Sequence, residues 1–258
     1  MHGARLSGLL LVDKPEGLTS HDAVERVRRA LGGVRVGHTG TLDPFATGLL
    51  VLCVGGATRL AEYLVALPKR YRATLRLGVR TDTHDRAGTV IARDGSWVVL
   101  SREAIEDALR AQASRTEQRV PAYSAKRRGG VRLYEAARRG SPVAPPVVRV
   151  RIYRVEVLDV DGPDVTFEVE CSAGTYVRAI ARDVGEDLGV GAHLVALRRL
   201  EVGAFRVEDA VPPDALDDPA RLCAALRPPE DAVAHLPRCV LAPAEARRFA
   251  AGQAVAAA

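Results

Sequence analysis

A short polar segment between two apolar runs carries the residues of this sequence that could do chemistry. It reads Arg-Val-Gly-His-Thr-Gly-Thr-Leu-Asp-Pro, from Arg35 to Pro44. Pro44 biases the preceding Asp43 toward an extended or turn conformation. A carboxylate held on a stiff loop beside buried strands can act as a nucleophile or a general base. The segment alone leaves the alternative of an Asp that caps a turn.

Two predicted strands would hold this segment in place. They are the apolar runs over residues 8–12 and 49–54. Between the first strand and the polar segment, a helix is predicted from Thr19 to about Leu31. Thr19 and Asp22 have the spacing of a capping box, and the apolar residues that follow recur on one helical face.

A period-two pattern follows the second apolar run. Tyr71 and the alternate apolar residues after it predict a half-buried strand over residues 69–77, with a basic outer face that includes Arg70 and Arg72. We also predict strands over residues 147–160, 165–171 and 193–200, and helices over residues 57–67, 101–113, 174–188, 219–226 and 243–251.

Residues 119–139 form a basic segment. They contain seven Lys or Arg side chains against one acid, Glu135, with Tyr123 and Tyr134 among them. Gly129 and the glycine after it would hinge this arm. The segment could be a solvated face. Basic and aromatic side chains together are also what contact with a phosphate backbone and its bases requires.

The composition fits a globular protein of one large or two unequal domains. The 258 residues are 47% hydrophobic and 27% charged, with a net charge of +5 and a pI of about 9.3, which is compatible with a polyanionic partner. The four cysteines have no C-x-x-C spacing, so we expect no metal site. We find no secretory signal and no apolar run of membrane-spanning length, and we expect a cytoplasmic protein.

Four separated stretches together resemble the TruB family of tRNA pseudouridine synthases. They are residues 13–15, 37–48, 69–72 and 174–178. The resemblance runs from residue 8 to about residue 205, and it also includes Ser124-Ala125, residues 133–135 and residues 191–200. It implies a pseudouridine synthase fold: α+β, with a mixed, largely antiparallel sheet, flanking helices and a central basic cleft.

The resemblance also implies an activity. The family isomerises uridine-55 in the T loop of tRNA by flipping the base out and exchanging its C1′–N1 bond for a C1′–C5 bond. This reaction needs no metal and no cofactor. Asp43 matches the single Asp that the family uses, which either attacks the sugar or base covalently or assists a glycal-forming elimination. We expect a monomer that acts on the T stem-loop of tRNA.

Further residues match family positions in the substrate pocket. Arg178 matches an Arg that pairs with the catalytic Asp, and a neighbouring cation favours the ionised carboxylate. Tyr71 matches a Tyr that stacks on the target base, and a core Tyr is its alternative. His38 matches an aromatic wedge that replaces the flipped base in the stack. The other matches are Tyr176 and Leu197 in the pocket wall, Lys14 as a brace for the loop, and Asp85 as a polar residue near the site.

The extent of the catalytic region is predicted from the composition, which becomes Pro-rich after about Val207, and from the family resemblance. We expect the catalytic domain over residues 1–207, with an RNA-gripping arm over residues 115–145. Residues 208–258 would be a Pro-rich extension with a truncated or vestigial PUA-like segment. Two other functions stay open: a tRNA-binding folding chaperone that needs no catalysis, and the subunit of a guide-RNA-dependent pseudouridine synthase.

Overall fold

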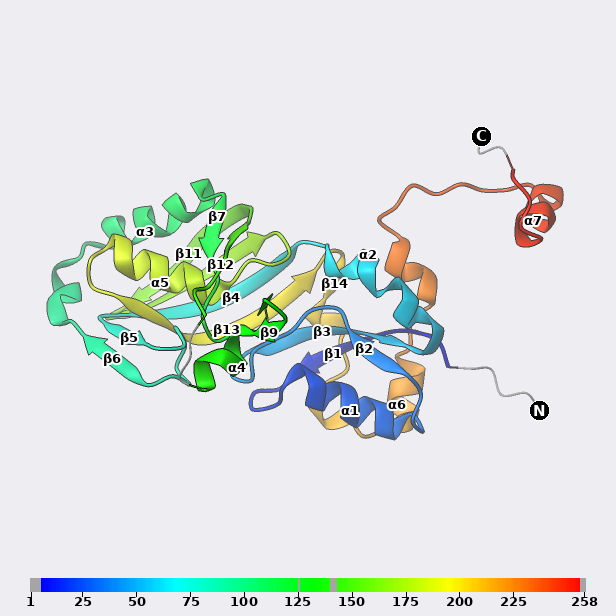
Figure 1. Ribbon diagram of the computed structural model, residues 1–258, viewed down its shortest axis with the longest axis horizontal. Helices are drawn as coiled ribbons and strands as arrows, with labels where there is room; N and C mark the ends of the chain where they lie inside the picture. Colours follow the sequence, from blue (N-terminus) through cyan, green and yellow to red (C-terminus); the bar gives the residue numbers. More distant parts are fainter. Residues whose placement is uncertain (1–5, 125, 140–142, 256–258) are drawn as a thin grey trace.

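The computed structural model describes residues 6–124, 126–139 and 143–255, and within them the chain is organised around an eight-stranded sheet (Figure 1). Its main strands, in spatial order, are β1 (Gly8–Lys14), β3 (Thr47–Val54), β13 (Ala192–Val202), β4 (Lys69–Leu77), β12 (Asp164–Cys171) and β11 (Ile152–Asp161). Two short strands extend it, β2 (Val36–His38) on β3 and β14 (Phe205–Arg206) on β13. Neighbours are antiparallel except β13 and β3, which are parallel. The predicted α+β class with a mixed, largely antiparallel sheet is confirmed.

Helices cover the two halves of this sheet differently. On the β1–β3 half, α1 (Ser20–Ala30) and α6 (Pro219–Ala224) pack against one face, and α2 (Ala61–Val65) packs against the other. On the half that contains β4, β12 and β13, α3 (Arg102–Ala111) and α5 (Val177–Asp187) cover a single face.

This difference in cover explains the two hydrophobic patterns of the sequence. Strands β1 and β3 are unbroken apolar runs because both of their faces are buried. Strand β4 alternates because its inward residues, from Tyr71 onward, meet the helices while Arg72 and Arg76 face outward. The capping box between Thr19 and Asp22 is present at the start of α1, as predicted.

The outer face of β4 is basic in sequence but paired in the fold. Arg70 and Arg72 both bind Glu168 of the neighbouring β12, at 2.5 and 2.8 Å. Arg76 binds Asp164 of the same strand at 2.6 Å. The basic side chains expected on this outer face are present, but two carboxylates of β12 offset part of the charge of the three guanidinium groups.

Two predicted elements differ from the structure. The helix expected over residues 57–67 is a 3₁₀ helix (Gly55–Leu60) followed by the single turn of α2. The strand expected over residues 147–160 is two strands. The first, β10 (Val147–Arg149), is not part of the eight-stranded sheet and pairs instead with β7 (Glu117–Arg119). The second is β11.

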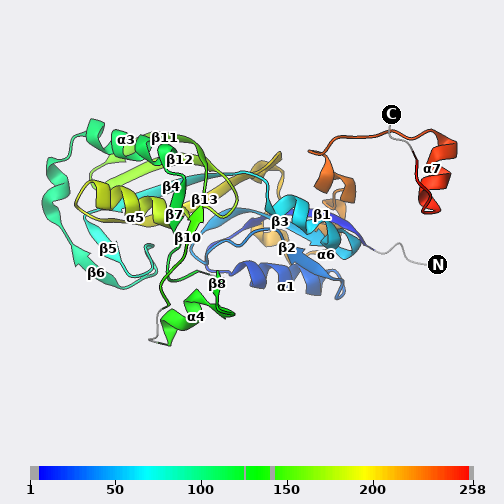
Figure 2. The ribbon, with the colours of Figure 1, turned by 45° about the horizontal axis from the view of Figure 1, so that its top comes forward.

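The β7–β10 pair forms the base of the basic arm. Beyond it lie the hairpin of β8 (Arg127–Arg128) and β9 (Val131–Arg132) and the short helix α4 (Leu133–Arg138). Figure 2 shows the hairpin and α4 projecting away from the sheet. Residues 125 and 140–142 of the predicted arm lie outside the described residues.

Most of the segment after residue 207 packs on the body. Val211 and Arg227 form bridges to β1, and Leu222 of α6 is buried in the same cluster as α1. Helix α7 (Pro243–Ala250) stands away from the body at the end of an extended stretch (Figure 1). The hairpin of β5 (Val79–Thr81) and β6 (Val90–Arg93) lies at the opposite end. No helix in the described residues is long and apolar enough to cross a membrane.

Candidate active site

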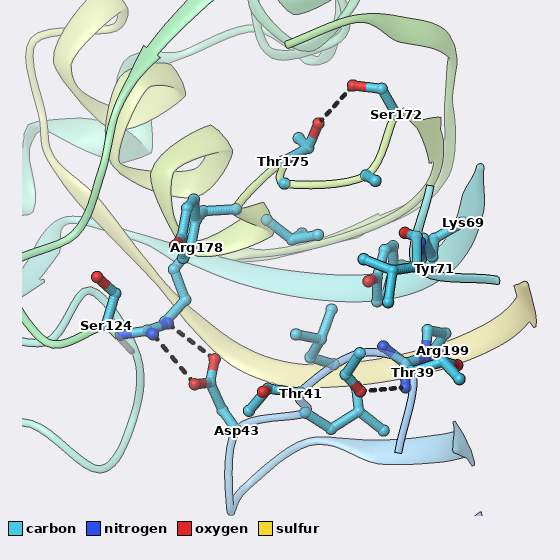
Figure 3. A pocket seen from close by; sticks show the side chains of 18 residues that line it. Thr39, Thr41, Asp43, Lys69, Tyr71, Ser124, Ser172, Thr175, Arg178 and Arg199 are labelled. Atoms are coloured by element: carbon cyan, nitrogen blue, oxygen red, sulfur yellow. Dashed lines mark hydrogen bonds and ion pairs between the residues drawn. The ribbon is translucent and has the colours of Figure 1, made fainter. Parts of the chain in front are cut away.

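A pocket of about 250 Å³ lies beside the point where β3 pairs with β13 and the two halves of the sheet meet. Strands β3 and β13 pair only through Arg198 with Thr47 and Arg199 with Gly48. The loop before β3, strands β4 and β13, and the start of α5 line the pocket (Figure 3). Residues from separate parts of the chain therefore meet at this point.

Asp43 and Arg178 face each other across this pocket. The Arg178 Nε lies 2.9 Å from one carboxylate oxygen of Asp43, and its second terminal nitrogen donates to the other at 3.1 Å (Figure 3). A two-bond guanidinium–carboxylate pair holds both groups in a fixed relative orientation. The Asp43 side chain stays 32% exposed, so the carboxylate is reachable from the pocket.

Arg178 also holds two other segments in place. Its terminal nitrogens donate to the backbone carbonyls of Thr83 and Tyr123, both at 2.9 Å. The carboxylate of Asp85 lies 3.4 Å from the Arg178 terminal nitrogen that donates to Thr83. Because its side chain is only 5% exposed and bonded on all sides, Arg178 ties the Asp43 loop to the 82–89 loop and the base of the arm.

Opposing effects set the charge of Asp43. Burial raises the pKa of its carboxyl above the ordinary value, and the Arg178 guanidinium is the main group that opposes this rise. The nearby carboxylate of Asp85 pushes the pKa further up, whereas Lys14 lowers it. The ionised form that a nucleophile or base needs therefore depends on Arg178.

The loop that carries Asp43 is braced from behind. The Ser20 hydroxyl accepts from the Leu42 N–H at 2.8 Å, and the Pro44 carbonyl accepts from the Gly17 N–H at 2.8 Å. Lys14 is fully buried, and its ammonium donates to the Leu18 carbonyl at 2.7 Å and to the Pro44 carbonyl at 3.4 Å. Burial lowers the pKa of Lys14 to about 8.

The structure brings only some of the predicted site residues to the pocket surface. Tyr71, Tyr176 and Leu197 line it together with Asp43 and Arg178. Tyr71 and Leu197 come from the paired strands β4 and β13, and Tyr176 precedes α5, where its N–H donates to the Gln118 side chain at 2.8 Å.

Three other predicted residues lie outside the pocket wall. Lys14 sits behind the Asp43 loop, and Asp85 sits behind Arg178. His38, in β2, borders a second hollow of about 380 Å³ with His21, Arg28 and Arg35 among its neighbours. The buried Nδ1 of His38 has no hydrogen-bond partner among the described residues, and burial lowers its pKa.

Two cations in the pocket wall were not among the site residues predicted from the sequence. Lys69 and Arg199 are both buried, and both line the pocket opposite the Asp43–Arg178 pair (Figure 3). The period-two rule would have found them, because Lys69 lies two residues before Tyr71 and Arg199 two after Leu197, on the same strand faces.

No group of three or more His, Cys, Asp or Glu side chains could hold a metal ion in the part of the chain that the structure describes. The donors around the pocket are instead one carboxylate and several cations. This arrangement suits carboxylate chemistry on a polyanionic substrate.

Comparison with known proteins identifies the family. Residues 28–177 match the N-terminal domain of the TruB family pseudouridylate synthases, and residues 178–246 match the tRNA pseudouridylate synthase B C-terminal domain. The chain belongs to the TruB family. The boundary between the two matched regions falls just before Arg178, so the site takes Asp43 from one region and its partner from the other.

Relatives named tRNA pseudouridine synthase B match most of the chain. The protein of Syntrophobacter fumaroxidans is 48% identical over 234 residues, which cover 90% of this chain and 76% of that protein. The protein of Mycobacterium sp. (strain KMS) is 47% identical over 261 residues, which cover 99% and 87%.

Solved structures share the fold. A chain of a Cbf5-Nop10-Gar1 complex is 30% identical with a TM-score of 0.69, and the match covers 90% of this chain and 63% of that one. A chain of an H/ACA RNP bound to a substrate RNA containing 2′-deoxyuridine is 28% identical with a TM-score of 0.65, over 90% and 62% of the two chains.

Proposed function

We propose that this chain isomerises uridine-55 in the T loop of tRNA to pseudouridine, as a monomer and with Asp43 as the essential carboxylate. The observation that carries the proposal is the Asp43–Arg178 pair, which lies at the wall of an accessible pocket. Membership of the TruB family and the names of the relatives support the same reaction on tRNA.

The pocket residues have distinct roles in this reaction. The C1′–N1 bond of the nucleoside breaks, the base rotates, C5 bonds to C1′ and loses its proton, and N1 takes up a proton. Asp43 supplies the carboxylate that attacks the nucleoside or assists elimination, and Arg178 keeps it ionised. Tyr71 stacks on the base, and Tyr176 and Leu197 bound the space in which the base turns.

The basic arm and His38 bind the RNA in this proposal. Flipping the uridine out of the T loop costs a few kcal/mol of stacking, and an inserted aromatic ring recovers about 1–3 kcal/mol. His38 supplies this ring in the proposal; it lies on β2 and lines the second hollow together with Arg28 and Arg35. The arm projects from the body, where it can contact the phosphates of the T stem.

The test is to map pseudouridine in tRNA after incubation with the purified chain. Unmodified tRNA transcripts, with and without a uridine-to-cytidine change at position 55, are incubated without added RNA or protein. We expect one new pseudouridine, at position 55, only in the unchanged tRNA. Conversion at other positions would contradict the assigned specificity. Conversion only with an added guide RNA would favour a subunit of a guide-RNA-dependent synthase. Binding without conversion would favour a tRNA-binding folding chaperone.

A further inference from the structure

The charges around the pocket fall into two groups. On one side, Asp43 and Asp85 are both paired with Arg178. On the other side, Lys69 and Arg199 form no ion pair with any carboxylate among the residues that the structure describes. The second wall therefore carries positive charge that the protein itself does not neutralise.

Two backbone carbonyls hold the Arg199 guanidinium. Its Nε donates to the Leu49 carbonyl at 2.7 Å, and a terminal nitrogen donates to the Gly40 carbonyl at 3.1 Å. The side chain is 2% exposed. These two bonds leave further guanidinium N–H groups, and they fix the cation against the loop that carries Asp43.

Lys69 lies on the adjacent strand. Its ammonium donates to the Val65 and Leu67 carbonyls at 2.5 and 2.6 Å. Burial, and secondarily Arg199, lower the pKa of Lys69 to about 8, so it is mostly protonated at pH 7. Tyr71 lies beside the two cations, on the side of the pocket opposite Asp43 (Figure 3).

Every route to pseudouridine places negative charge on the base. If the carboxylate attacks the sugar, or if the sugar eliminates, the C1′–N1 electron pair leaves with the base as a uracil anion. If the carboxylate adds to the base, the electrons move onto the base oxygens as an enolate. Preorganised donors at developing negative charge are a large source of rate enhancement in buried sites.

We infer, on the basis of the proposed function, that Arg199 together with Lys69 stabilises the negative charge on the detached or attacked uracil. The charge is transient: the C5–C1′ bond forms with electrons of the base, C5 releases its proton, and N1 takes one up. Burial of two unpaired cations in the pocket wall then has a chemical purpose, because a carboxylate partner would cancel their effect on the base.

The test compares two RNA substrates that differ in leaving-group strength. T-arm stem-loops carry uridine or 5-fluorouridine at the target position, and the fluorine makes the uracil anion more stable. Single-turnover loss of the N-linked nucleoside is followed by nuclease digestion and mass spectrometry for wild type, Arg199→Met, Arg199→Lys and Lys69→Met. Arg198→Met is the matched control, because Arg198 is the preceding residue of β13 and pairs with Asp13 at 2.7 Å.

We expect Arg199→Met to slow the reaction of uridine RNA by about 10²-fold or more. Its RNA dissociation constant should change by less than about threefold, as for a loss confined to the transition state. Arg199→Lys should retain most of the wild-type rate, and the rate loss of Arg199→Met should be several times smaller with 5-fluorouridine RNA than with uridine RNA. Arg198→Met should match wild type.

An equal loss on both substrates would assign Arg199 a structural role and overturn the inference, as would an unchanged rate in Arg199→Met. If Arg199→Met does not fold, the same comparison with Lys69→Met decides the inference. A wild-type chain that produces no pseudouridine would instead refute the proposed function, so the two failures are distinguishable.

Discussion

The Asp43 carboxylate and the Arg178 guanidinium lie 135 residues apart in the chain and meet through two contacts of 2.9 and 3.1 Å. Arg178 is simultaneously bound by the backbone carbonyls of Thr83 and Tyr123. The carboxylate is therefore oriented before any substrate arrives, because the group that orients it is itself bound by two other segments of the chain. Such preorganisation is what a precise reaction geometry requires.

Replacing the carboxylate by its amide tests the central role of Asp43. Asparagine has nearly the same shape but carries no charge and is neither a nucleophile nor a base. We expect Asp43→Asn to lower the rate of tritium release from 5-tritiated uridine tRNA by at least about 10³-fold. RNA affinity, measured by filter binding, should be retained. Substantial tritium release by this variant would remove Asp43 from its role.

Removing the guanidinium should change the pH dependence. Asp43 must be ionised to react, burial raises its pKa, and Arg178 opposes that rise. In Arg178→Met the pKa of Asp43 should therefore rise, and the acid limb of the single-turnover pH–rate profile should move to higher pH. Arg182→Met, one helical turn later and paired with Asp183, should leave the limb in place. An unmoved limb in Arg178→Met would show that Asp43 does not set it.

Local patterns in the sequence predicted the elements around the site. The Thr19–Asp22 capping box marked the start of α1 because it involves only neighbouring residues. The unbroken apolar run of β3 and the alternation of β4 likewise reflect how many faces of each strand are buried. Strand β3, which follows the Asp43 loop, could thus be predicted without knowledge of the fold, whereas β2, which precedes the loop, was not predicted.

Pairings between distant segments could not be predicted in this way. The contact of Glu168 with Arg70 and Arg72 exists only because β12 lies beside β4, and this neighbour offsets part of the positive charge of the row. The burial of Lys69 and Arg199 depends on the pairing of β4 with β13. The meeting of Asp43 and Arg178 was expected from the family resemblance, since no local pattern connects residues 135 positions apart.

The basic arm should control affinity and leave the chemistry unchanged. Lys126 and Arg127 are exposed on the arm, and each phosphate contact contributes about one unit to the slope of log affinity against log salt. The double change Lys126→Gln with Arg127→Gln should weaken tRNA binding and reduce this slope by roughly 1–2. The single-turnover rate at saturating enzyme should stay at the wild-type value.

The matched control for the arm uses arginines that are already paired with carboxylates of the protein. Arg72 and Arg76 are bound by Glu168 and Asp164 on the sheet, so changing both to Gln should leave the salt slope unaltered. Titrations of fluorescent tRNA at several salt concentrations give the slopes. Equal slopes for wild type and the arm variant would contradict phosphate contact by these two residues.

The close approach of β3 and β13 should make Gly48 indispensable for stability. Gly48 has φ = +102°, and a Cβ there would lie 2.2 Å from the carbonyl oxygen of Arg199. An alanine must therefore both adopt a strained backbone and push the strands apart. We expect Gly48→Ala to lower the free energy of unfolding by about 2–4 kcal/mol in urea titrations. Gly37→Ala is the control, because its Cβ would meet no heavy atom within 4 Å and its stability should stay within about 1 kcal/mol of wild type. Equal stability of Gly48→Ala and wild type would mean that the two strands can separate at this point without cost.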